Sequence, residues 1–232
     1  MSGTLEVIVN TLFGLVLIYL IIVMVGALGV CSASSVTVVQ ITKRNVINKM
    51  YGQAMKTISG DWLEKHGFEF AGCFRTKPRR GESGIVGWKH ASGSTYFCLY
   101  LYHTGQNSKE FLTLYTGSSR LFTSSRADEL LIPHGAGCWM QAFHRCSIER
   151  MWMLHTEAET FLRQELGYTL ADVTDNLDKE IAKAVRCQMD HVRSQLLWPL
   201  RIPFWIVTRI CRLHGKTIAL QVARRSDIEF MM

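Results

Sequence analysis

Apolar residues follow three patterns along this chain: a continuous run, then alternation with a period of two, then helical spacing. In the continuous run, no charged residue stands between Glu6 and Lys43, and residues 12–30 are almost wholly apolar. A helix needs about 20 apolar residues to cross the hydrocarbon core of a bilayer. Lipid offers no hydrogen-bond partner to the backbone, so such a segment must be helical. The pattern predicts a transmembrane anchor over residues 1–34.

Positive charge follows this run but does not precede it. Lys43, Arg44, Lys49 and Lys56 come after it, whereas residues 1–10 contain no Lys or Arg. A cleaved signal peptide, the alternative interpretation, begins with a basic segment and has a shorter apolar core. Because Lys and Arg concentrate on cytoplasmic flanks, we expect a retained single-pass anchor with the N-terminus outside and the C-terminal domain cytoplasmic. Seven cysteines without a CxxC pair agree with a reducing compartment.

The part after the anchor predicts a helix and then strands. Apolar residues recur at helical spacing from Met50 to Trp62, and Gly67 stands where a helix would end. The period then changes to two in six segments: 68–75, 84–90, 94–103, 110–116, 120–125 and 136–144. Short turns between them favour antiparallel pairing, since parallel strands need a longer crossover. Both faces of 94–103 are apolar, which predicts a central strand.

Two helices are expected after the strands. An apolar stripe runs from Ile148 to Gly167, and a second follows the capping-box pair Thr169 and Asp172 as far as Leu197. The order is that of an α+β fold: an N-terminal transmembrane helix, then an antiparallel sheet of about five or six strands with helices before and after it. We divide the chain into an anchor (1–34), an α+β domain (35–167), and C-terminal helices with a basic amphipathic tail (168–232).

The tail is strongly basic. No acidic residue lies between Asp190 and Asp227, and the seven basic residues in that interval equal the formal net charge of the whole chain, +7. Trp beside Arg is typical of a segment at a membrane surface facing anionic lipid headgroups. The residues expected at that surface are Trp198, Arg201, Phe204, Trp205, Arg209, Arg212 and Lys216. A core helix whose arginines reach solvent explains the same pattern. Nucleic-acid binding is not expected, because no groove-reading motif accompanies the charge.

Four residues are candidate metal ligands: His134, Cys138, His144 and Cys146. Neutral imidazole and thiolate are zinc ligands, but their spacing matches no common site. A strand-end histidine and a packed cysteine explain the same residues, so we expect no metal and no cofactor. Gly215-Lys216-Thr217 does not make a phosphate loop, because Ile210 stands where the first glycine is needed.

These patterns favour a binding or interaction module over an enzyme. We expect an accessory subunit or sensor at the cytoplasmic membrane face, in contact with the lipid bilayer and with a protein partner or membrane complex. The alternative is a membrane-anchored, hydrolase-like enzyme using His90, His103 and His155, with His134 and His144, at one end of the sheet. That alternative requires at least two of these histidines in one pocket, with a carboxylate or cysteine within hydrogen-bond reach.

Overall fold

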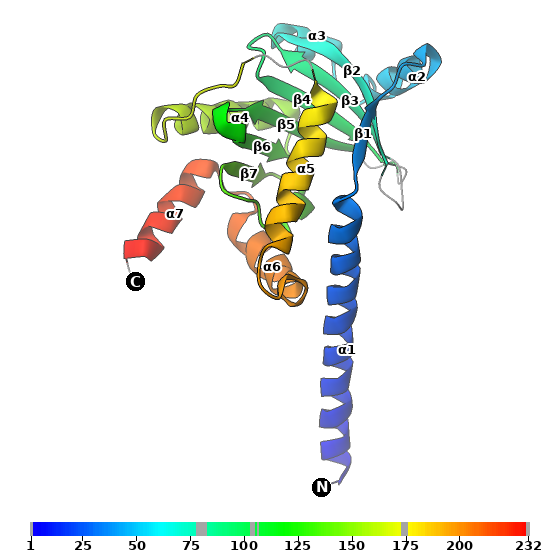
Figure 1. Ribbon diagram of the computed structural model, residues 1–232, viewed down its shortest axis with the longest axis vertical. Coiled ribbons are helices and arrows are strands. Elements are labelled where there is room, and N and C mark those ends of the chain that lie inside the picture. The colour runs from blue at the N-terminus through cyan, green and yellow to red at the C-terminus, as the bar shows by residue number, and fades with distance from the viewer. Residues whose placement is uncertain (1, 78–82, 103–104, 106, 173–175, 231–232) are drawn as a thin grey trace.

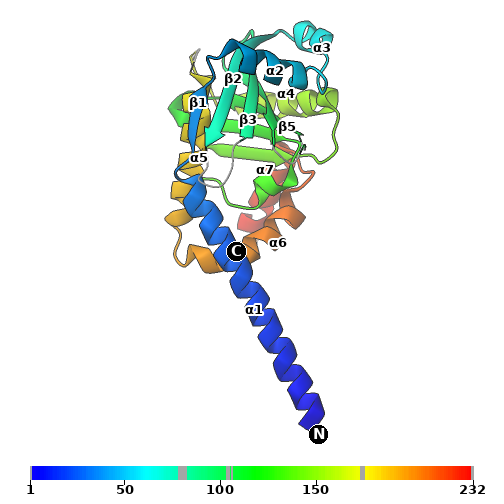
Figure 2. The same ribbon diagram turned by 90° about the vertical axis from the view of Figure 1, so that its right-hand side faces the viewer.

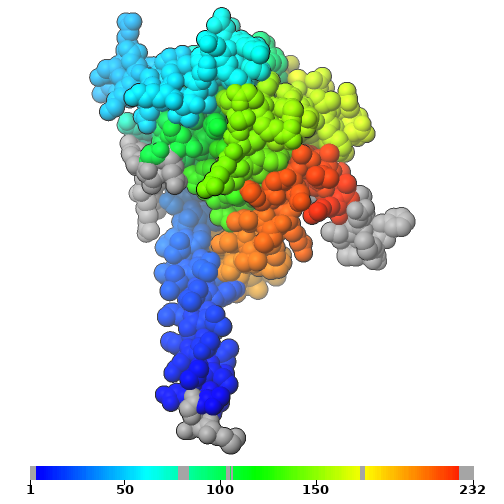
Figure 3. Space-filling model, turned by 180° about the vertical axis from the view of Figure 1, so that it is seen from behind, coloured from blue at the N-terminus to red at the C-terminus, as the bar shows by residue number. Residues whose placement is uncertain are grey.

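A long apolar helix projects from the domain in the computed structural model, which describes residues 2–77, 83–102, 105, 107–172 and 176–230. Helix α1 (Ser2–Ala33) contains 32 residues, about 48 Å at 1.5 Å per residue. Figures 1 and 3 show it standing away from the body for much of its length. Its large apolar side chains are exposed from Leu5 to Leu28. Within the described residues, Thr4–Ala33 is the one helix long and apolar enough to cross a membrane.

The body is built on a mixed sheet of seven strands in the order β1-β2-β3-β4-β5-β6-β7. The strands are β1 Thr37–Gln40, β2 Phe68–Lys77, β3 Ser83–His90, β4 Thr95–Leu101, β5 Asn107–Leu114, β6 Arg120–Ser124 and β7 Cys138–Ala142. All neighbours are antiparallel except β6 and β7, which are parallel. The α+β class is confirmed, whereas the expected five or six strands were too few.

Two features of the sheet explain the difference. Strand β1 has only four residues, and it lies in the uncharged segment directly after α1, where alternation is not visible. Thirteen residues separate β6 from β7, and they include the short 3-10 helix η2 (Ala127–Leu130). A connection of about a dozen residues is long enough to return the chain to the same end of the sheet. Strand β7 therefore pairs parallel to β6.

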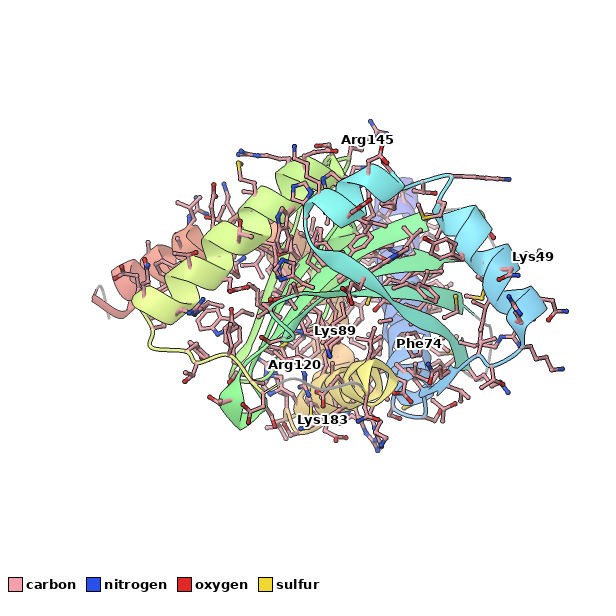
Figure 4. All side chains as sticks on the ribbon, turned by 90° about the horizontal axis from the view of Figure 1, so that it is seen from above. Lys49, Phe74, Lys89, Arg120, Arg145 and Lys183 are labelled. Carbon is pink, nitrogen blue, oxygen red and sulfur yellow. The ribbon has the colours of Figure 1, made fainter. Side chains whose placement is uncertain are left out.

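Helices α2 (Arg44–Ala54), α3 (Gly60–Lys65) and α4 (Ile148–Gln164) cover one face of the sheet. Figure 4 shows them on the side opposite α5. Trp62 of α3 and Met151 of α4 share a buried cluster with inward-facing strand residues. The single helix expected between residues 50 and 67 is two helices, because the chain turns between them to bury Ile58.

Helix α5 (Leu177–Arg193) covers the other face, where Leu177 and Ile181 share a buried cluster with residues of strands β2 to β6. It begins later than the predicted capping box, since the residues around that box pair with the end of β5. The Thr116 amide donates to the Thr169 carbonyl at 2.9 Å, and the Ala171 amide donates to the Leu114 carbonyl at 3.0 Å. Strand β4 is therefore central and covered on both faces, as its two apolar faces predicted.

Helices α6 (Trp198–Leu213) and α7 (Ile218–Phe230) complete the chain, and the short 3-10 helix η1 (Thr116–Ser118) precedes β6. Helix α6 packs against the second half of α1, as Figures 1 and 2 show. The contact is close at Gly26, where an added Cβ would lie 2.7 Å from Cγ2 of Ile202. A buried cluster joins α1, α5 and α6 beneath the sheet.

Candidate functional site

A cavity of about 170 Å³ lies between the sheet and α5. Its apolar wall consists of Val36, Phe122, Met140, Ile181, Ala184 and Val185. Its polar wall consists of Thr76, Tyr100, Glu110, Glu129, His134, Cys138 and Gln188. Val185 also packs against the buried cluster that joins α1 to α6. The cavity therefore lies between the sheet and the part of the body from which α1 projects.

Glu110 is a buried carboxyl group in the middle of the sheet. It is 6% exposed and lies on the face of β5 that α5 covers, together with Leu112 and Leu114. The Tyr100 hydroxyl donates a hydrogen bond to Oε1 of Glu110 at 3.0 Å. Burial raises the pKa of Glu110 far above the usual carboxyl range, and the nearby Glu129 raises it further. This carboxyl group therefore favours its neutral form.

Glu129 extends from η2 toward the same cavity. Arg126, which lies three residues earlier in the chain, pairs with Asp128 and lies over the ring of Tyr102. Among the described residues, no hydrogen bond reaches the Glu129 carboxyl group. Its pKa is raised by burial first and by Asp128 second, against an opposing effect of Arg126. The cavity thus contains two carboxyl groups without a paired cation.

His134 and Cys138 form a neutral pair at the cavity wall. The Nδ1 atom of His134 lies 3.5 Å from Sγ of Cys138. Its Nε2 atom lies 3.2 Å from the Glu129 carbonyl oxygen and 3.3 Å from Nε2 of Gln188. Burial, with Arg209 nearby, lowers the pKa of His134 to about 4. Burial raises the pKa of Cys138 to about 12, so imidazole and thiol are both uncharged at neutral pH.

The possible metal site is divided by the structure. Strand β7 ends at Ala142, so His144 lies in an exposed turn and does not share a strand face with Cys138. Cys146 packs against the cluster on the opposite face of the sheet. Among the described residues, no group of three or more His, Cys, Asp and Glu side chains is arranged to hold a metal ion. Of the four candidates, the structure brings together only His134 and Cys138.

Two histidines of the enzyme alternative lie against the same side chain: the ring centroids of His90 and His155 are 5.4 and 6.0 Å from that of Trp152. His155 is fully buried, with its ring nitrogens 2.8 Å from the hydroxyls of Thr113 and Thr123. Burial lowers the pKa of His155 to about 3. His90 is half-buried at the end of β3, 2.9 Å from the Ser92 hydroxyl, and burial lowers its pKa. His103 lies outside the described residues. Of the described histidines in that alternative, His134 is the one that lines this cavity.

The basic tail divides into buried and exposed residues. Trp205 is only 5% exposed and packs against Val30 of α1, and Trp198 lies partly buried at the same cluster. Trp205 therefore belongs to the buried cluster between α1 and α6. Phe204 is 60% exposed. The Arg201 side chain is exposed, with its guanidinium carbon 5.8 Å from the centroid of the Trp205 ring.

The remaining three basic residues of the predicted membrane surface lie further along the tail. Arg209 donates a hydrogen bond to the Leu130 carbonyl oxygen at 2.9 Å, which ties α6 to η2. Arg212 is exposed near the end of α6, and Lys216 is half-buried before α7. Arg209 thus links α6 to η2 within the domain. Arg201 instead lies next to the exposed residue Leu200 of α6.

Four polar residues of the cavity were not predicted from the sequence: Tyr100, Glu110, Glu129 and Gln188. A signal was present for Glu110, because a period of two places it on the same strand face as Leu112 and Leu114. An acidic residue on an apolar strand face is uncommon unless it has a partner or a function. No comparable pattern marks Glu129, which lies in a short connection.

Comparison with protein families, with curated proteins and with solved structures found no match to this chain.

Proposed function

We propose that this protein is a single-pass, membrane-anchored binding module that acts as an accessory subunit or sensor at the cytoplasmic membrane face. The proposal is carried by one observation: an exposed apolar stripe on α6 lies beside the exposed apolar helix α1. Leu200, Phe204 and Val207 are 46%, 60% and 64% exposed and recur at helical spacing. Leu196 and Leu197 precede them and are 82% and 63% exposed. An apolar surface of this kind is typical of a membrane or protein contact.

The position of α6 along α1 supports a membrane contact. The Tyr19 hydroxyl donates to the Leu200 carbonyl oxygen at 2.6 Å, and Ile202 contacts Gly26. The first turn of α6 therefore lies beside the part of α1 between these two residues. At 1.5 Å per residue, the helix rises about 22 Å from Thr4 to Tyr19 and about 33 Å from Thr4 to Gly26. The hydrocarbon core of a bilayer is about 30 Å thick. A bilayer that surrounds the free part of α1 would end near the first turn of α6.

Charge gives the proposed orientation. Arg201 lies next to the apolar stripe, where it would meet anionic headgroups at the edge of the apolar layer. Lys43 and Arg44 follow α1 on the domain side, which favours a cytoplasmic domain. The hydrolase alternative is not favoured, because His155 is fully buried with both ring nitrogens held by threonine hydroxyls. The cavity beneath α5 supports the binding role, because it is a concave site in which apolar and polar side chains converge.

Depth-dependent fluorescence tests the membrane contact. In full-length protein with Cys31, Cys187 and Cys211 changed to serine, an environment-sensitive fluorophore is attached at Leu197→Cys, and the protein is reconstituted in phosphatidylcholine–phosphatidylserine nanodiscs. We expect blue-shifted emission and strong quenching by spin-labelled lipid, since this position should lie at the edge of the apolar layer. The matched control is Lys49→Cys on α2, which Figure 1 shows at the opposite end of the body.

The control fluorophore should show water-like emission and little quenching by lipid. Equal, water-like behaviour at residues 49 and 197 would contradict the role of α6. The exposed stripe would then bind a protein, and the membrane-anchored module would depend on α1 alone. Release of the full-length protein from membranes by alkaline carbonate would contradict the anchor itself.

A further inference from the structure

The cavity beneath α5 has an unbalanced charge. Glu110 and Glu129 both line it, whereas no Lys or Arg is among the described residues of its wall. The neighbouring arginines are engaged elsewhere: Arg126 pairs with Asp128, Arg120 pairs with Glu180 at 3.2 Å, and Arg209 donates to the Leu130 carbonyl oxygen. His134, the remaining basic group of the wall, favours its neutral form. Two acidic groups therefore share this cavity without a Lys or Arg among the described residues of its wall.

Two carboxyl groups in one cavity, without a cationic side chain in the described part of its wall, can be stabilised in two ways. A buried carboxylate without a partner is costly, so it either takes up a proton or accepts a cation. The Tyr100 hydroxyl satisfies one oxygen of Glu110, while no described side chain donates to Glu129. The remaining oxygens are thus available to a donor that enters the cavity, and a positively charged donor would gain most from them.

Size and wall chemistry narrow the choice of cation. A cavity of about 150 Å³ accepts benzene, so one of about 170 Å³ has room for a compact ligand of about six non-hydrogen atoms. Phe122, Met140 and Ile181 provide apolar surface beside the two carboxyl groups. A dehydrated metal ion would need several converging ligands, and among the described residues no such group of three exists. An ammonium ion with a short hydrocarbon body fits both halves of the wall.

We propose that this cavity binds a small primary ammonium ion, whose –NH₃⁺ group faces Glu110 and Glu129 and whose carbon chain lies against Phe122, Met140 and Ile181. The proposal names the ligand class of the binding module and therefore rests on the proposed function. A primary ammonium group is favoured over a quaternary one because its three N–H donors can reach both carboxylates.

The test compares a charged probe with its neutral counterpart. Full-length protein in nanodiscs is titrated with n-butylammonium chloride, with n-butanol, and with sodium chloride at matched ionic strength. We expect n-butylammonium to bind by calorimetry and to raise the unfolding temperature with concentration, since a ligand of the native state stabilises it. The neutral alcohol should give less than about a tenth of that affinity, because it lacks the charge that the carboxylates recognise.

Two variants locate the binding. Glu129→Gln and Glu110→Gln keep the side-chain shape but remove the negative charge, and each should weaken n-butylammonium binding by at least about tenfold. The control is Glu69→Gln, an exposed glutamate of β2 outside the cavity, which should leave binding unchanged. If a cavity variant fails to fold, the comparison of n-butylammonium with n-butanol on the native protein still shows whether binding requires the positive charge.

Three results would overturn the proposal: equal effects of the alcohol and the ammonium ion, unchanged affinity in both cavity variants, or stabilisation by magnesium chloride without any by n-butylammonium. The last would make the cavity an inorganic cation site. None of these results bears on membrane attachment, which the fluorescence experiment tests separately.

Discussion

The buried polar residues of the domain are satisfied to different degrees. His155 lies between two threonine hydroxyls, and Nε2 of Gln141 donates to Oγ1 of Thr123 at 2.9 Å and to the Leu154 carbonyl oxygen at 2.9 Å. A satisfied buried network of this kind stabilises one arrangement of the core. Glu110 has a single hydrogen bond and an acidic neighbour. We therefore expect the carboxyl groups, rather than His155, to make stability depend on pH near neutrality.

The first prediction concerns that pH dependence. Glu110 and Glu129 have pKa values raised from the ordinary 4.5 to about 8 and about 7. Their protonated forms favour the folded state, so their stabilising contribution is complete below about pH 4.5 and is lost as pH rises through 7 and 8. Between pH 6.5 and 8.5 the free energy of unfolding should fall by on the order of 2 kcal/mol. Chemical denaturation of the detergent-solubilised protein measures it.

Other titratable groups at the cavity should not obscure this effect. Tyr100, Cys98 and Cys138 have raised pKa values and stay neutral in this interval. Arg126 stays ionised, because its hydrogen bonds to Asp128 raise its pKa, and His134 stays neutral in the folded protein, because burial lowers its pKa. The variant Glu110→Gln should flatten the decline, whereas Glu69→Gln should not. A decline of the same size in both variants would assign the pH dependence to other groups.

At the scale of elements, the contact between α1 and α6 holds the body against the proposed anchor. Ile202 is 3% exposed, and its Cγ2 atom occupies the space that a side chain on Gly26 would need. Gly29 lies on the same helix, and an added Cβ there would meet no atom within 4 Å. The two glycines therefore form a matched pair for testing this packing.

The second prediction uses this pair. Gly26→Ala should destabilise the domain by about 1–3 kcal/mol relative to Gly29→Ala, because the new methyl group forces α1 and α6 apart. Both changes improve helix propensity equally, so the difference reports the contact. Denaturation in detergent measures the two variants against the native protein. Equal stability of both would mean that α6 does not pack on α1 at this position.

At the scale of the whole molecule, cysteine exposure makes the topology testable. Cys187 of α5 and Cys211 of α6 are exposed, while Cys73 and Cys98 are buried. The first pair can report on which side of the membrane the domain lies, whereas buried thiols are slow to react on either side.

The third prediction is the result of that labelling. A membrane-impermeant maleimide applied to intact cells should miss Cys187 and Cys211 and should label them after lysis. In the variant Ser2→Cys, the new cysteine should be labelled on intact cells, since the N-terminus faces outward in the proposed orientation. Labelling of Cys187 and Cys211 on intact cells would reverse the orientation.

Much of the fold was predictable from local pattern. The alternation in residues 94–103 marked the central strand β4, and the stripe that begins at Ile148 marked α4. Strand β1 was not predictable, because its four residues pair only through their distant partner β2. The parallel pairing of β7 was equally hidden, since the direction of a strand depends on the path of the connection before it.

The sequence by itself determined the long apolar helix, the helix–sheet–helix order and the excess of positive charge in the tail, because each follows from residues close together in the chain. Tertiary structure alone decided that Trp205 is buried against α1 while Phe204 stays exposed. It also decided that Glu110 and Glu129 share a cavity, since the strand and the 3-10 helix that carry them are brought to one cavity only in the folded domain. The spacing of residues along the chain determines which side chains share a face of a helix or strand. Only the tertiary packing determines which other elements that face contacts.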